Sequence, residues 1–80
     1  MKIIKFEKPN CVPCTMVQNL LDDKGVKVEK INPFDNPDEA IKYQIGSVPV
    51  VILLDEDKEL KRSIGYKPEE LEEIIKDYLN

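Results

Sequence analysis

The sequence contains no histidine, no tryptophan and only two cysteines, Cys11 and Cys14. A closed zinc site takes four protein ligands, mostly Cys and His, so this chain lacks the residues for one. Disulfide-stapled secreted modules of this size carry more cysteines, so that class is also disfavoured. Two cysteines separated by two residues, in a reducing compartment, indicate redox or metal chemistry instead.

Long apolar runs and long basic runs are absent as well. No stretch approaches the ~20 apolar residues that span a bilayer, and residues 1–5 lack the apolar centre of a signal peptide. These absences predict a cytoplasmic protein without membrane contact. Twelve basic and sixteen acidic residues are interspersed and leave a net charge of −4, so we expect no nucleic-acid partner.

The length of 80 residues predicts a single domain over residues 1–80, with one layered core and no room for a deep substrate cavity. No repeat, low-complexity segment or linker interrupts the chain. We therefore expect a monomer that acts at its surface on a partner that brings its own bulk.

Hydrophobic periodicity predicts seven elements in the order β-α-β-α-β-β-α. Strands are predicted over 2–7, 26–31, 50–54 and 59–64, and helices over 11–25, 36–46 and from 68 onward. Gly25 and Gly46 stand where the first two helices are expected to stop. This order predicts an α/β fold with a four-stranded mixed sheet and helices on both faces.

The segment Cys11-Val12-Pro13-Cys14 falls where the first strand has ended and the first helix begins. Unpaired backbone N–H groups and the positive end of the helix dipole stabilise a thiolate there. We therefore expect Cys11 to be the attacking thiolate and the more buried Cys14 to be the resolving thiol. Lys8 adds positive charge nearby, and Glu7 partly opposes it.

Other interpretations of the cysteine pair remain open at this point. A structural disulfide across so short a loop closes little chain and adds little stability. An inert pair of buried thiols is a second alternative. The third is a copper carrier, because small copper-binding domains also place C-x-x-C between a first strand and a first helix. Those domains usually carry Met two positions before the first Cys, where this chain has Pro9.

The segment Ser47-Val48-Pro49-Val50 is the second informative motif. Proline is tolerated at the first residue of a buried strand, because its missing N–H falls at the end of the ladder. The alternative interpretation is a cis Val48–Pro49 bond that turns the Val48 backbone outward, where an extended substrate segment can pair with it.

Taken together, these motifs resemble the thioredoxin superfamily over nearly the whole chain. The element order is similar to that of its glutaredoxin-sized members, and residues 8–15 resemble the Cys-Val-x-Cys region of NrdH-type redoxins. Residues 65–69 are similar to the Gly-Phe-Arg-Pro-Asp segment of those proteins. The resemblance implies catalysis by Cys11 and Cys14 and substrate contacts through Val12, Pro13, Val48, Pro49, Gly65 and Tyr66.

The same resemblance implies partners and cofactor use. Such proteins reduce protein disulfides, commonly deliver electrons to ribonucleotide reductase, and are reloaded by a flavin-containing thioredoxin reductase. The only redox group expected is the Cys11–Cys14 disulfide, with no bound cofactor and no metal. Glutaredoxins hold glutathione with a Gly-Gly-x-Asp segment, which here reads Ser63-Ile64-Gly65-Tyr66, so glutathione is the less expected reductant.

Other positions depart from the thioredoxin pattern. Asn10 and Val12 replace the Trp and Gly of Trp-Cys-Gly-Pro-Cys. Lys5 falls where thioredoxins bury an acid beneath the cysteines, so the resemblance implies a different proton route for Cys14.

Overall fold

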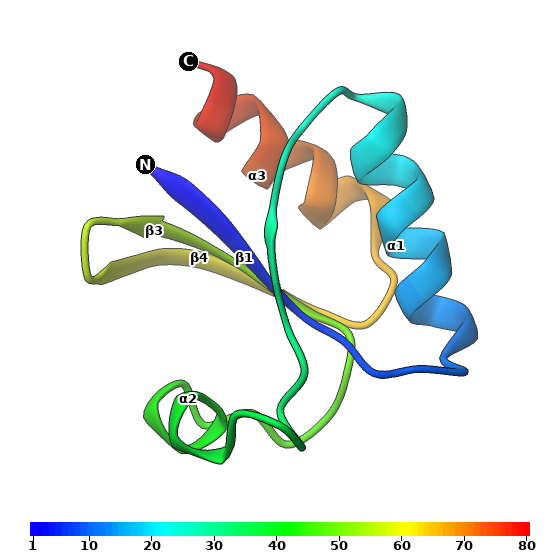
Figure 1. Ribbon diagram of the computed structural model, residues 1–80. Helices are drawn as coiled ribbons and strands as arrows, with labels where there is room; N and C mark the ends of the chain where they lie inside the picture. The colour runs from blue at the N-terminus through cyan, green and yellow to red at the C-terminus, as the bar shows by residue number, and fades with distance from the viewer.

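The computed structural model describes residues 1–80 and contains the seven predicted elements in the predicted order (Figure 1). They are β1 (Lys2–Phe6), α1 (Val12–Asp23), β2 (Glu29–Ile31), α2 (Pro37–Lys42), β3 (Val50–Asp55), β4 (Lys58–Ile64) and α3 (Pro68–Leu79). The longest helices have 12 residues, and no helix is both long and apolar enough to cross a bilayer.

The four strands form one mixed sheet in the order β2-β1-β3-β4. Strand β1 pairs with β2 in parallel, whereas the β1–β3 and β3–β4 pairs are antiparallel. The helix α1 makes the crossover between the two parallel strands, and a turn at Glu56 and Asp57 joins β3 to β4. The predicted mixed sheet is confirmed.

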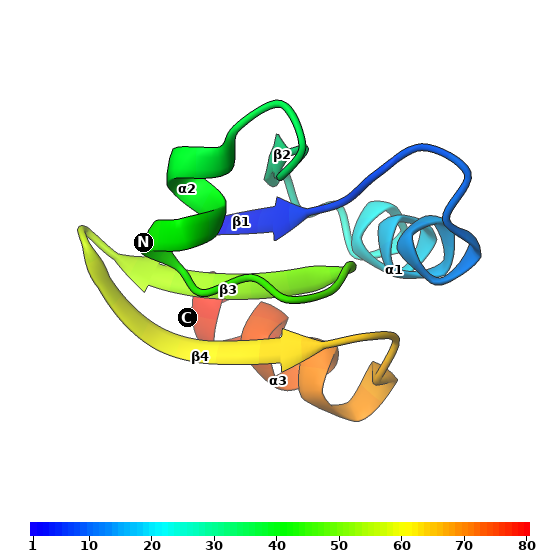
Figure 2. The same ribbon diagram turned by 90° about the horizontal axis from the view of Figure 1, so that it is seen from below.

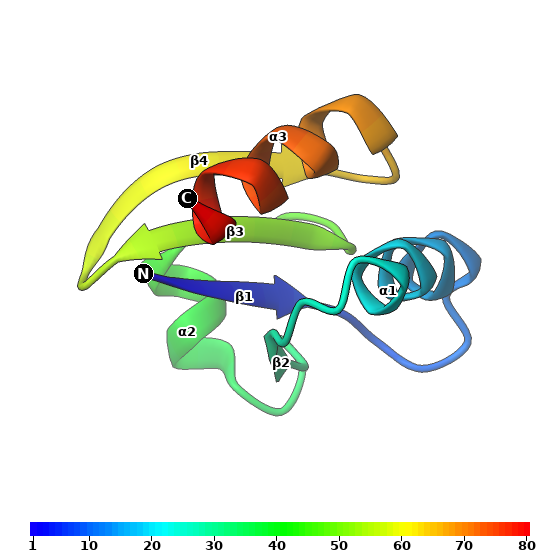
Figure 3. The same ribbon diagram turned by 90° about the horizontal axis from the view of Figure 1, so that it is seen from above.

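Helices cover both faces of this sheet, as predicted. Figures 1 and 3 show α1 and α3 on one face and α2 on the other. The core under α1 and α3 contains Ile3, Val17, Leu21, Val26, Val51, Leu53, Leu71, Ile74 and Ile75. The core on the α2 side contains Ile4, Phe6, Ile31, Val50, Ile52 and Leu54. Strand β3 is continuously apolar because its alternate side chains enter two buried layers.

Helix α1 ends in a Schellman motif at Gly25, where the sequence predicts its stop. Gly25 has φ +68°, and its N–H donates to the carbonyl of Asp22 at 3.0 Å. The N–H of Val26 donates to the carbonyl of Leu21 at 3.0 Å, and both side chains are buried in the same core. The chain thereby turns from α1 toward β2.

The second strand is shorter than predicted. The sequence pattern predicts residues 26–31, but pairing with β1 covers only Glu29–Ile31. Val26 is buried because it packs with α1 in the Schellman contact, and Val28 packs against the same core from outside the ladder. The alternation of Val26, Val28 and lysines therefore reflects core packing before the ladder begins.

The prediction that Gly46 stops the second helix is wrong. Helix α2 ends at Lys42, and Gln44 adopts the left-handed conformation with φ +54°. The N–H of Gln44 donates to Ile41 and that of Ile45 donates to Ala40, which is a second Schellman motif. Ile45 packs on the α2-side core, whereas Ile41 is 75% exposed.

We predict that Gly25→Ala lowers the free energy of unfolding by about 1 kcal/mol, because a Cβ strains the left-handed conformation. Gly46→Ala is the matched control: both glycines have open space around a new Cβ, but only Gly25 has positive φ. Urea unfolding followed by circular dichroism measures both. Equal unfolding free energies for the two variants would contradict the assigned cap.

Candidate functional site

The two cysteines form a disulfide at the start of α1, with their Cα atoms 5.2 Å apart. Cys11 is the N-cap residue in the loop after β1, and Cys14 lies in the first helical turn. Cys14 is only 4% exposed, whereas Cys11 is half-buried. The two sulfurs therefore differ in their access to solvent.

Backbone donors at the helix start point toward Cys11. The N–H of Cys14 donates to Cys11 Sγ at 3.2 Å, and the N–H of Thr15 donates to the Cys11 carbonyl at 3.1 Å. Pro13 has no N–H, which removes one of the donors that a helix start leaves unpaired. The sulfur thus takes the place of the side-chain oxygen in an ordinary N-cap.

Asn10 makes the turn that delivers Cys11 to this position. Its φ is +58°, a left-handed conformation that asparagine adopts more readily than most residues. Cys11 follows in an extended conformation, with φ −120° and ψ 104°. Asn10 therefore has a local backbone role at the position that Trp occupies in thioredoxins.

The predicted segments converge at one end of the sheet. Phe6 pairs with Val50, and Val50 pairs with Ile64, so the end of β1, the start of β3 and the end of β4 lie side by side (Figure 2). The N–H of Gly65 donates to the carbonyl of Pro49 at 2.8 Å. The Val48–Pro49 bond is cis, which is one of the two interpretations of that motif, and Pro49 is buried.

Apolar side chains at this end of the sheet remain open to solvent. Val12 is 73% exposed, Tyr66 is 37% exposed and Pro13 is exposed as well. Val48 is half-buried and lines a shallow cavity with Lys8 and Phe34, a residue that the sequence analysis does not single out. Phe34 is 75% exposed, so an aromatic ring faces solvent on this surface.

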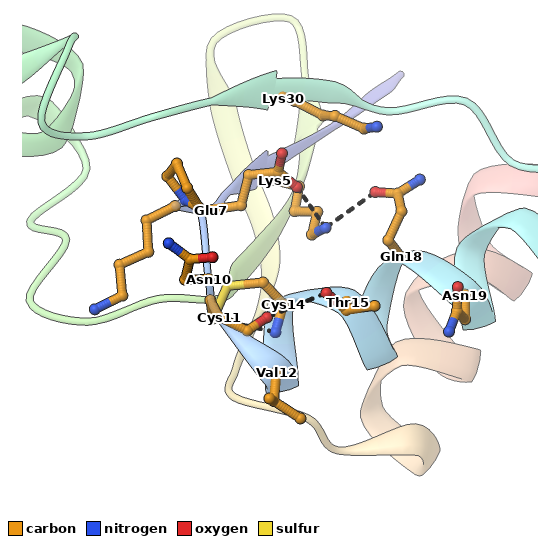
Figure 4. Close-up of a pocket in the computed structure, with 12 residues that line it drawn as sticks. Lys5, Glu7, Asn10, Cys11, Val12, Cys14, Thr15, Gln18, Asn19 and Lys30 are labelled. Carbon is orange, nitrogen blue, oxygen red and sulfur yellow. Dashed lines mark hydrogen bonds and ion pairs between the residues drawn. A yellow bond between two sulfur atoms is a disulfide. The ribbon is translucent and has the colours of Figure 1, made fainter.

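A polar pocket lies beside the disulfide, and sequence reasoning misses its composition. Figure 4 shows Lys5 pointing between Glu7 and Gln18, with both cysteines in the same pocket wall. Lys5 Nζ donates to Glu7 Oε1 at 2.5 Å and to Gln18 Oε1 at 3.0 Å. Glu7, which the sequence predicts to offset part of the charge of Lys8, forms an ion pair with Lys5.

Two residue spacings in the sequence indicate part of this pocket. Lys5 and Glu7 are two residues apart in the predicted strand over residues 2–7, which places both side chains on one face of the sheet. Gln18 follows Cys14 by four residues, which places both on one face of the helix. Only the packing of that helix on that sheet face brings the two sets together.

Lys61 on β4 forms ion pairs with two carboxylates of α3. The pKa of Lys61 is raised, because its ammonium is hydrogen-bonded to the carboxylates of Asp77 and Glu73 on α3. No three or more His, Cys, Asp or Glu side chains converge as a metal-binding set. The candidate site is therefore the disulfide, its exposed apolar surround and the polar pocket beside it.

The glutaredoxin family profile matches residues 3–58. The chain is 42% identical over 78 residues to the SPbeta prophage-derived thioredoxin-like protein YosR of Bacillus subtilis, covering 96% of this chain and 98% of that protein. It is 31% identical over 81 residues to Bacillus subtilis thioredoxin, covering 92% of this chain and 78% of thioredoxin.

Solved structures share the fold. Thioredoxin NaTrxh from Nicotiana alata superposes with a TM-score of 0.82 at 28% identity, covering 94% of this chain and 70% of that chain. Thioredoxin 1 from Thermosipho africanus has a TM-score of 0.73 at 27% identity, covering 99% of this chain and 94% of that chain. The predicted thioredoxin-like fold is confirmed.

We predict that iodoacetamide alkylates Cys11 before Cys14 in the reduced protein at neutral pH. Cys11 is the more exposed sulfur, and the helix start favours its thiolate. Peptide mass spectrometry measures the order of modification. Single-cysteine variants are the controls: Cys14→Ser is expected to react about tenfold faster than Cys11→Ser. Faster reaction at Cys14 would contradict this assignment.

Proposed function

The chain belongs to the glutaredoxin family within the thioredoxin superfamily, and from this membership we propose that it is a dithiol redoxin that reduces disulfide bonds in other proteins. The observation that carries the proposal is the asymmetry of the cysteine pair. Cys11 is partly exposed, and its sulfur accepts a hydrogen bond from the N–H of Cys14 at the helix start. Cys14, three residues later, is buried. This arrangement suits one attacking and one resolving sulfur.

The first step is attack on the substrate by Cys11. Its thiolate attacks one sulfur of the substrate disulfide, the substrate S–S bond breaks, and the other substrate sulfur leaves as a thiolate that takes a proton from water. A mixed disulfide now joins Cys11 to the substrate. The Cys14 amide and the positive end of the helix dipole stabilise the starting anion.

The second step is resolution by Cys14. Cys14 loses its proton and attacks Cys11 Sγ, and the S–S bond to the substrate breaks. The substrate sulfur is expelled as a thiolate and takes up a proton, so the substrate leaves as a dithiol. Two electrons have moved from the protein to the substrate, and the Cys11–Cys14 disulfide has formed. The structure is that of this oxidised form.

We assign substrate contact to the apolar surround of Cys11. Val12, Pro13 and Tyr66 present apolar surface to solvent there, and Val48 adds a half-buried side chain at the same end of the sheet. Pro49 and Gly65 hold the backbone of that end through their hydrogen bond. An open surface of this kind suits a disulfide presented by another protein better than a small molecule that needs enclosure.

We further propose that thioredoxin reductase, rather than glutathione, reduces the oxidised form, and that ribonucleotide reductase is one electron acceptor in the cytoplasm. The resemblance of residues 8–15 and 65–69 to NrdH-type redoxins supports this assignment. In the segment where glutaredoxins hold glutathione, Ser63 is buried and donates to Glu70 Oε1 at 3.0 Å. Tyr66 stands there in place of the acid.

We predict that Cys11→Ser abolishes the acceleration of insulin reduction by dithiothreitol, because it removes the attacking sulfur. Cys14→Ser is expected to accumulate mixed disulfides with insulin chains, visible on non-reducing gels and reversed by excess dithiothreitol. Circular dichroism spectra matching the parent serve as the control for folding. Parent-like activity of Cys11→Ser, or stoichiometric Cu(I) uptake by a parent that exchanges no disulfides, would contradict the proposal.

NADPH with thioredoxin reductase is expected to reduce the oxidised protein at least about tenfold faster than glutathione at its cellular concentration, because the chain lacks the Gly-Gly-x-Asp segment. NADPH consumption coupled to insulin turnover measures the first rate, and NADPH consumption through glutathione reductase measures the second. A faster glutathione route would overturn the assignment of the reductant.

A further inference from the structure

Lys5 is the only charged side chain that the fold buries. The chain has twelve Lys and Arg and sixteen Asp and Glu, yet Lys5 at 1% exposure is the single one among the buried residues. Burial of an ammonium is costly unless hydrogen bonds and an opposite charge compensate it. A lysine kept in the core therefore calls for an explanation beyond packing.

Compensation of the Lys5 charge is partial. Its ammonium has one carboxylate partner, Glu7 at 2.5 Å, and one neutral partner, Gln18 at 3.0 Å. Glu7 is 30% exposed, so water solvates and screens part of its charge. Gln18 keeps its orientation by donating to Asp22 Oδ1 at 2.8 Å.

The buried ammonium lies on the side of the cysteines. Lys5, Cys11 and Cys14 line one pocket, and Gln18, which Lys5 contacts, lies one helical turn from Cys14 on the same face of α1 (Figure 4). The other charged residues of this pocket are Glu7 after β1, Lys8 in the loop and Lys30 on β2. Helix α1 contributes only neutral side chains to it, and Val48 and Pro49, which precede β3, are uncharged.

Charges at this site differ in how strongly they act on the sulfurs. Lys8 and Lys30 are exposed, so water and salt screen them. Lys5 is shielded from solvent, and its field acts through protein of lower effective dielectric. Among these charges, Lys5 is the one positioned to distinguish a neutral disulfide from an anionic sulfur.

We propose that the ammonium of Lys5, moderated by Glu7, stabilises the negative charge that reduction places on the Cys11–Cys14 pair and thereby sets its reduction potential. This inference rests on the proposed redox function. Reduction of the disulfide takes up two electrons and two protons, and one thiol then loses its proton to give the thiolate. The disulfide is neutral, so a positive charge stabilises the reduced form selectively and makes the potential less negative.

Under this proposal, two single variants shift the reduction potential and the thiolate midpoint in opposite directions. Lys5→Met removes the positive charge and leaves Glu7 unopposed, so the first thiolate should form at a pH about one unit higher. At a pH above this thiolate midpoint, the equilibrium constant for reduction then falls about tenfold. The reduction potential becomes about 30 mV more negative. Glu7→Gln removes the moderating negative charge, so the thiolate should form at a lower pH and the reduction potential should become less negative.

Equilibration of each protein with mixtures of reduced and oxidised dithiothreitol measures its reduction potential. Ultraviolet absorbance of the thiolate against pH measures the thiolate midpoint. Dithiothreitol supplies both electrons and becomes a cyclic disulfide. Lys30→Met is the matched control: it removes the same charge from the same pocket at an exposed position, so its shift should be under a third of that of Lys5→Met. Urea unfolding of every variant records stability separately.

A purely structural Lys5 would lower stability in Lys5→Met and leave potential and thiolate midpoint at the parent values, which would overturn the inference. Shifts of the same sign in Lys5→Met and Glu7→Gln would overturn it as well. If Lys5→Met fails to fold, Glu7→Gln decides the question by its sign alone. Failure of the proposed function is a distinct result, because the parent protein would then reach equilibrium with dithiothreitol but not accelerate insulin reduction.

Discussion

The structure of this site depends on the unpaired N–H groups at the start of α1. A helix start leaves several donors without partners, and here a sulfur accepts one of them: the amide of Cys14 donates to Cys11. Pro13 removes another donor, and Asn10 makes the left-handed turn that brings Cys11 to the N-cap. An anion at Cys11 strengthens this interaction, whereas a neutral sulfur accepts it weakly, so the local backbone favours the reactive state.

The sheet decides what surrounds that helix start. Strand β3 is buried on both faces and pairs with β1 and β4, so residues distant in sequence meet where these strands begin or end. Val48 and Pro49 lie at the end of the sheet where β1 finishes because they precede β3, and Tyr66 lies at that end because it follows β4. A chain of this length forms a reactive edge more readily than a closed cavity, which agrees with the exposed Val12.

Alternate side chains of β1 enter the two cores on opposite faces of the sheet. Ile4 and Phe6 enter the α2-side core, and Ile3 enters the core under α1 and α3. Lys5 shares the face of Ile3, so the alternation of the strand directs its ammonium toward α1 and the cysteines. Strand geometry thus leaves a charge in the interior at the one place where the chain also carries redox chemistry.

The sequence alone determined the element order, the two-sided burial of β3, the cap at Gly25 and the cysteine pair at a helix start, because period, capping residues and C-x-x-C spacing are local signals. It misplaced the end of α2, since Gln44 gives no local sign that it adopts positive φ. Only the tertiary structure decided that Lys5 pairs with Glu7 and Gln18. That network exists because α1 packs across one face of β1, and the contact joins residues 13 positions apart through an arrangement of layers that no local pattern specifies.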